Sequence, residues 1–157
     1  MKNLIHKSLF AFALLLASIA FTSTAHAQGV GRTNDIAIVR DPELEAKSLV
    51  DLRAARFYFK ERKAYFGALD RCEAVLAENP MFTQLDEVLY IAGSSSLRLS
   101  RNQGRQAAKL PPEKLREQGR TYLTQLVKEY PASDFKERAE TELREFDKGI
   151  KAVTRQP

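Results

Sequence analysis

The amino-acid sequence predicts an all-α fold in which helical hairpins stack into a short α-solenoid closed by a C-terminal capping helix. Apolar residues recur every three or four positions through most of the chain after residue 41, as expected for helices with one buried face. No segment alternates apolar and polar residues over a useful strand length. Two helix endings also repeat one another, which indicates stacked hairpins. With 157 residues, 44% of them hydrophobic, the chain is long enough for one small domain.

The first 27 residues have the three parts of a secretory signal peptide. Lys2 and Lys7 give a positive start, the apolar run 9–21 follows, and Ala25-His26-Ala27 is a small-x-small cleavage site. The apolar run has 13 residues, which is too short to span a bilayer comfortably. We therefore expect a periplasmic protein that is at most associated with the outer membrane. It is not expected to be a lipoprotein, because no cysteine lies near residue 28.

Composition limits the chemistry available to the exported chain. Both histidines, His6 and His26, lie in the signal peptide, so cleavage leaves no imidazole for a general base, a Ser-His-Asp triad or a metal site. The single cysteine, Cys72, excludes an intramolecular disulfide and a cysteine-based zinc site. We therefore expect a non-enzymatic protein with no catalytic residue, no metal and no cofactor.

Hairpin one is expected over residues 41–80, after a flexible, glycine-containing leader at 28–40. Asp41 is placed to cap the first helix, and Pro42 suits its first position. Asn79-Pro80 ends the second helix, because proline disfavours helical geometry at the residue before it. The buried stripes are Leu49, Leu52, Ala55 and Phe59 in the first helix, and Tyr65, Ala68, Leu69, Cys72, Val75 and Leu76 in the second.

Hairpin two, residues 84–131, and a terminal helix, 133–155, complete a helical domain that spans residues 41–155. The segment at about 100–113 between the two helices of hairpin two is polar and basic, and we interpret it as an insertion. The expected buried stripes of hairpin two are Leu85, Val88, Leu89 and Ala92, then Leu115, Gly119, Tyr122, Leu123, Leu126, Val127 and Tyr130.

The internal repeat lies at the ends of the two hairpins. Ala68, Cys72, Val75 and Pro80 have the same spacing as Gly119, Leu123, Leu126 and Pro131. A small residue that permits close helix contact, an inward apolar pair and a terminating proline are typical of one helix of a tetratricopeptide hairpin.

The chain resembles the BamD (YfiO or ComL) family of tetratricopeptide proteins in outer-membrane protein assembly, over about residues 41–143. The phrases that carry the resemblance are Ala55-Arg56-Phe57-Tyr58-Phe59, Lys63-Ala64-Tyr65, Leu76-Ala77-Glu78-Asn79-Pro80, Asp86-Glu87-Val88-Leu89-Tyr90, Tyr122-Leu123 and Val127-Lys128-Glu129-Tyr130-Pro131-Ala132-Ser133. The resemblance implies a periplasmic scaffold that binds protein segments. Family members are typically acylated and have about five repeats, whereas this chain has no cysteine near residue 28 and two expected hairpins with a terminal helix.

A concave face formed by the first helix of each hairpin is the expected binding surface. The repeat frame places six residues there, with aromatic area and cations suited to an extended peptide or a carboxylate. The alternative is that Phe57 and Tyr90 pack between the hairpins. The six residues are Arg53, Phe57 and Lys60 in hairpin one and Tyr90, Ser94 and Arg98 in hairpin two.

The insertion is a second candidate surface. Between residues 98 and 120 there are seven basic residues and two acidic ones, and Arg101, Arg105 and Lys109 lie within the insertion. Such a cluster could attract an acidic protein or an anionic lipid surface, including peripheral contact with the outer membrane, although a solvated loop is the commoner explanation. Nucleic acid is not expected, because no aromatic residue is interleaved with these cations.

The function expected from these observations is a non-enzymatic periplasmic adaptor that binds protein partners or extended peptide segments of the cell envelope, with a BamD-like role. The alternative is a tetratricopeptide adaptor of another envelope complex, in division or peptidoglycan maintenance. The sequence does not distinguish the two.

Overall fold

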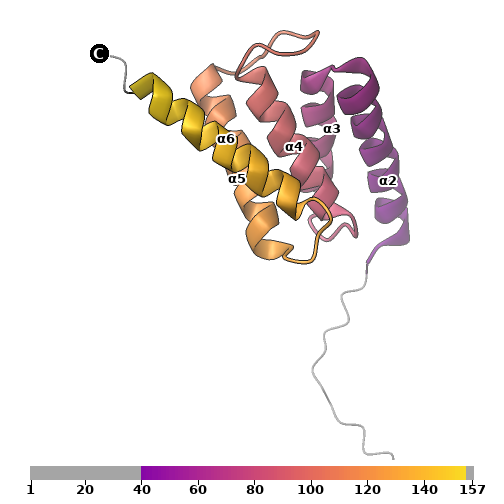
Figure 1. Cartoon of the computed structure of the whole chain (residues 1–157). Helices are drawn as coiled ribbons and strands as arrows, with labels where there is room; N and C mark the ends of the chain where they lie inside the picture. The colour runs from indigo at the N-terminus through magenta and orange to yellow at the C-terminus, as the bar shows by residue number, and fades with distance from the viewer. Residues whose placement is uncertain (1–39, 155–157) are drawn as a thin grey trace, which may run out of the picture. The chain divides into compact units, whose positions relative to one another are not determined.

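The computed structural model describes residues 40–154, which form five α-helices in sequence and contain no strand. Figure 1 shows α2, α3, α4 and α5 running alternately up and down, with α6 crossing α4 and α5. The predicted all-α class is confirmed. The expected signal peptide and most of the leader, 1–39, lie outside the described residues. The helices are α2 (Pro42–Phe57), α3 (Tyr65–Glu78), α4 (Leu85–Leu99), α5 (Pro112–Glu129) and α6 (Lys136–Thr154).

Each helix packs against the next one along the chain, and α4 also contacts both α2 and α6. Most residues of α4 are therefore buried, including Glu87 and Ser94, Ser95 and Ser96. The apolar residues form two adjoining clusters, one around α2, α3 and α4 and one around α4, α5 and α6. Because α4 contributes to both clusters, it is the central helix of the domain.

The helix boundaries follow the local chemistry. Asp41 caps α2, since its side-chain oxygen accepts hydrogen bonds from the amides of Glu43 and Leu44 at 2.9 and 3.4 Å. α2 continues into a π-helical turn, η1 (Tyr58–Arg62), which the sequence pattern did not predict. Lys63 then adopts a left-handed conformation, with φ of 48°, and breaks the helix before α3.

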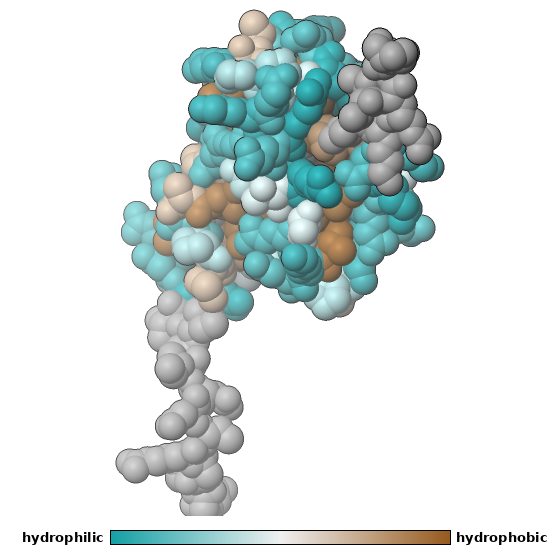
Figure 2. Space-filling model, turned by 90° about the vertical axis from the view of Figure 1, so that its left-hand side faces the viewer, coloured by the Kyte–Doolittle hydropathy of each residue, from teal (hydrophilic) through white to brown (hydrophobic). Residues whose placement is uncertain are grey.

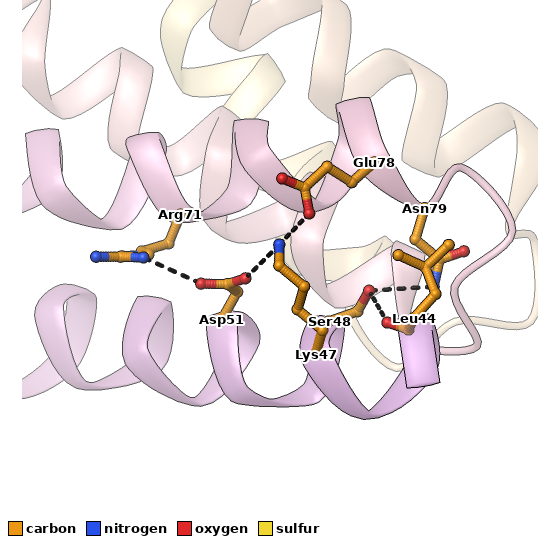
Figure 3. A network of polar contacts seen from close by, with 7 residues as sticks. All are labelled: Leu44, Lys47, Ser48, Asp51, Arg71, Glu78 and Asn79. Carbon is orange, nitrogen blue, oxygen red and sulfur yellow. Dashed lines mark hydrogen bonds and ion pairs between the residues drawn. The ribbon is translucent and has the colours of Figure 1, made fainter. Parts of the chain in front are cut away.

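A network of polar side chains joins α2 to α3 (Figure 3). Asp51 lies between Lys47 and Arg71, at 3.6 and 3.2 Å, and Lys47 also pairs with Glu78. In the buried part of the network, Asn79 donates from Nδ2 to Ser48 Oγ at 3.1 Å. Ser48 in turn donates to the carbonyl of Leu44, at 2.8 Å. Asn79 therefore ends α3 and also fixes it against the first turns of α2.

The contact between α4 and α5 is close because two glycines face each other. A Cβ placed on Gly93 would lie 2.6 Å from the side chain of Leu123, and one on Gly119 would lie 2.8 Å from Leu97 and 2.9 Å from the Gly93 carbonyl. Both sites exclude any larger side chain without movement of a neighbour. The expectation that Gly119 permits close helix contact is thus confirmed.

Most of the exposed residues of the domain are polar or charged. On the side of the molecule where α6 ends, hydrophobic side chains form small, separate patches (Figure 2). The large apolar residues that are exposed are Val50 and Phe57 of α2, Met81 between α3 and α4, and Leu110 between α4 and α5. Among residues 40–154, no helix combines the length and apolar character needed to cross a membrane.

Candidate partner-binding face

Three of the six residues expected on the binding face converge on one carboxylate of α6. Ser94 Oγ donates to Glu142 Oε2 at 2.7 Å, and the hydroxyl of Tyr90 donates to Oε1 at 3.3 Å. Arg98 Nη1 lies 3.4 Å from Oε1 and also donates to the carbonyl of Ser94, at 3.3 Å. Tyr90, Ser94 and Arg98 are spaced four residues apart on α4, so they share one side of the helix. That side faces α6.

Aromatic rings extend this cluster toward hairpin one. The guanidinium of Arg98 lies 5.0 Å from the ring centre of Phe59 and 5.5 Å from that of Tyr65. Phe59 is edge-on to Tyr90 at 6.4 Å, and Tyr90 stacks on Phe135 at 5.3 Å. Arg98 is thereby held by rings on one side and by Glu142 on the other. Tyr90 packs between Phe59 of η1 and Phe135 before α6, as the alternative interpretation holds for this residue, whereas Phe57 is half exposed.

The surroundings of the half-buried Tyr90 side chain raise the pKa of its hydroxyl. Burial raises the pKa of Tyr90 above its ordinary value, and the negative charge of Glu142 raises it further. Hydrogen bonding to Ser94 and the nearby charge of Arg98 act in the opposite direction. The hydroxyl therefore stays protonated at neutral pH and serves as a donor to Glu142.

Two depressions flank Glu142. The smaller, of about 110 Å³, lies near the end of α4, where Arg98 and Arg101 face Glu142 and Glu145. The larger, of about 390 Å³, is open, and we call it the α4–α6 groove. It is lined by Tyr90, Glu137, Arg138, Thr141 and Glu142. Its mixture of an aromatic side, two carboxylates and one cation can accept hydrogen bonds and pair with charges of either sign.

The three residues expected from hairpin one lie elsewhere. Arg53, Phe57 and Lys60 are exposed, and half of the Phe57 side-chain surface is accessible. Their neighbours face α4 instead: Arg56 binds Glu87 of α4 and Gln84, the residue just before that helix, and Phe59 lies against Tyr90. The π-helical turn adds to this difference, because it changes the angular spacing of the residues that follow Phe57.

The basic insertion folds back onto the turn between α2 and α3. The amide of Arg105 donates to the carbonyl of Lys63 at 3.2 Å, and the amide of Gly67 donates to Gln106 Oε1 at 2.9 Å. Lys109 Nζ lies 4.2 Å from the ring centre of Phe66. Gly104, with φ of 99°, packs so closely against Tyr65 that a Cβ would lie 2.6 Å from the ring. The loop is thus anchored at several points, and Arg101, Arg105 and Lys109 remain exposed.

Glu142, Phe59 and Phe135 are the residues of the face that sequence reasoning missed. Glu142 is one of several acidic residues on α6, and nothing in its spacing distinguishes it from Glu137, Glu140 or Glu145. The one available signal was the small Ser94 on α4, which leaves room for a longer polar side chain from the neighbouring helix. In the described part of the chain, no three His, Cys, Asp or Glu side chains are grouped as a metal site.

Comparison with known proteins adds no relative: no protein-family model, no curated protein and no solved structure matches the chain.

Proposed function

We propose that this protein is a non-enzymatic adaptor of the cell envelope that binds an extended protein segment in the α4–α6 groove, with a BamD-like role in outer-membrane protein assembly. The observation that carries the proposal is the open groove beside the Tyr90–Ser94–Arg98–Glu142 cluster. Fixed polar groups next to accessible aromatic surface suit a peptide that presents both backbone and side chains.

The order of helix contacts supports a tetratricopeptide-like arrangement. In such a stack the first helix of each hairpin lies beside the first helix of the next. α4 contacts α2 and α6 in addition to its neighbours in sequence, as this arrangement requires. The repeated spacing at Ala68–Pro80 and Gly119–Pro131 agrees with it. The α4–α6 groove then lies on the face that such stacks use for binding.

The cluster also explains how the groove keeps its shape without a ligand. Glu142 has its charge balanced by Arg98 and accepts from two hydroxyls, so its orientation is fixed. Arg98 is already paired in this way, and a partner's carboxylate would have to compete with Glu142 for it. Arg138, on the outer side of the groove, has no such partner among the described residues and is the more accessible cation.

Site-specific photo-crosslinking in the intact envelope tests the proposal. A photoreactive residue at Thr141, in the groove, is compared with one at Thr121, which lines an open depression of about 420 Å³ on α5 that lacks the Glu142 cluster. The two threonines are matched, since both are exposed and both donate to the carbonyl four residues earlier, at 2.9 Å. We expect a defined protein adduct from Thr141 and not from Thr121.

The identity of the adduct separates the two envelope roles. An outer-membrane assembly component supports the BamD-like role. A division or peptidoglycan protein instead supports the alternative adaptor and contradicts the BamD-like role. Equal adducts from both positions, or none from Thr141, contradict binding in the groove.

A further inference from the structure

We propose that the end of the helical domain where the α2–α3 turn meets the α4–α5 loop is a docking surface for an anionic phospholipid bilayer. The turn comprises residues 58–64 and the loop residues 100–111. This surface is distinct from the α4–α6 groove and does not depend on the function proposed for it.

The fold joins two basic segments that are far apart in the sequence. The insertion alone contains three cations, and the α2–α3 turn contributes three more. The backbone bond from Arg105 to Lys63 and the bond from Gly67 to Gln106 hold the segments side by side. Figure 1 shows both at the same end of the domain. We call the combined surface the basic patch: Lys60, Arg62, Lys63, Arg101, Arg105 and Lys109.

The charges of the basic patch are available to a partner. All six side chains are exposed, and within residues 40–154 none of them forms an ion pair with a carboxylate. Glu61 is the one acidic residue in the two segments, and Glu145 of α6 borders Arg101 at the small depression. By contrast, Arg98, Arg116 and Arg120 of the same stretch of sequence are paired with Glu142, Glu113 and Asp147.

The geometry favours a lipid surface over an acidic peptide. The patch is made of two turns at the outer end of the helices, whereas a peptide needs a groove with pockets for its side chains. A bilayer presents a flat array of negative charge, to which dispersed lysines and arginines respond without pockets. Leu110, 43% exposed at the end of the same loop, adds an apolar side chain of the kind that enters the interface.

Vesicle co-sedimentation of the full chain tests the proposal. The vesicles contain phosphatidylcholine alone or with phosphatidylglycerol, at low and at high salt. The patch variant carries Arg62→Gln, Arg101→Gln and Arg105→Gln. The control variant carries Arg40→Gln, Lys128→Gln and Lys148→Gln, which are exposed residues outside the patch that form no ion pair within residues 40–154. All three proteins have the same N-terminal segment, so differences between them report the substituted charges.

We expect binding to the anionic vesicles that weakens at high salt, as screening requires. The patch variant should lose about fivefold in partition coefficient per residue, or about 100-fold in all. The control variant should keep a partition coefficient close to that of the unsubstituted protein. Circular dichroism checks that both variants keep their helical content.

Three results would overturn the proposal. The first is equal loss in the two variants, which means that net charge alone acts. The second is equal binding to neutral vesicles. The third is tight, patch-dependent binding of a poly-glutamate peptide without vesicle binding, which would assign the patch to an acidic protein.

Discussion

The two sides of α4 are built in opposite ways. Toward α5, Gly93 and Gly119 let the helices meet closely, and the fully buried Leu123 fills the contact. Toward α6, the buried apolar residues Ala139 and Phe146 are joined by polar side chains around Glu142, with a depression on each side of that carboxylate. The close apolar contact stabilises the fold and leaves no room for a ligand. The polar contact holds α6 in place and keeps accessible surface beside it, so the two contacts should respond differently to substitution.

The largest effect is expected on the apolar side. Leu123→Ala removes a side chain with no exposed surface and should lower the free energy of unfolding by about 2–5 kcal/mol. Leu143→Ala, on α6, should cost less, because that side chain is partly exposed already. Urea denaturation measures both. An equal cost would contradict the difference between the two sides of α4.

Gly93→Ala should have the next largest effect. Its new Cβ would lie 2.6 Å from Leu123 and 3.1 Å from the carbonyl of Gly119, so the free energy of unfolding should fall by about 1–3 kcal/mol. The matched control is Gly67→Ala in α3, where the nearest atom is at 3.5 Å. That variant should be neutral or more stable by up to about 1 kcal/mol, because alanine favours helix. Thermal unfolding compares the two, and a neutral Gly93→Ala would disprove the close contact.

On the side of α4 that faces α6, Glu142→Gln should lower the free energy of unfolding by about 1–3 kcal/mol. The substitution removes a charge that accepts from Ser94 and Tyr90 and pairs with Arg98. Glu140→Gln is the control, since Glu140 pairs with Arg144 on the same helix at 3.8 Å and such surface pairs contribute about 0.5 kcal/mol or less. Chemical denaturation of both variants tests whether Glu142 is distinct from its acidic neighbours.

The smallest effect concerns alkaline pH. Because the pKa of Tyr90 is raised in the folded protein, the folded state keeps its proton at pH values where the unfolded chain has lost it. The resulting stability is present below the ordinary tyrosine pKa of about 10 and is lost as pH rises through the folded value. Tyr122 and Tyr130 act in the same direction. Tyr90→Phe should therefore make the decline shallower without abolishing it, as measured by urea unfolding from about pH 8 to about pH 11. An unchanged decline would show that Tyr90 does not contribute.

The sequence predicted the helices better than the surfaces they share. Spacing and capping residues are local, so the start of α2 at Pro42, the end of α3 before Asn79 and the role of Gly119 could be read directly. Which side chains meet across helices depends on rotation and tilt. Phe59, which the regular spacing already placed in the buried stripe, meets Tyr90, whereas Phe57 lies on the exposed side of α2.

Long-range partners were the least predictable. The four glutamates of α6 were equivalent in the sequence, and the packing of α6 selected Glu142. Similarly, the basic character of the insertion was evident from composition, but its contact with the α2–α3 turn depends on Gly104 and Gln106. Nothing in the spacing of these two residues indicated what they would touch.

Blocking the α4–α6 groove without unfolding the protein tests the central claim most directly. Thr141→Trp places a bulky side chain in the groove, and Thr121→Trp places the same side chain in the separate open depression on α5. The measurement is the amount of envelope partner that co-purifies with each variant, at a temperature where both are fully folded by circular dichroism. We predict that Thr141→Trp loses the partner and Thr121→Trp retains it. Retention of the partner by Thr141→Trp would contradict the assignment of the groove as the binding site.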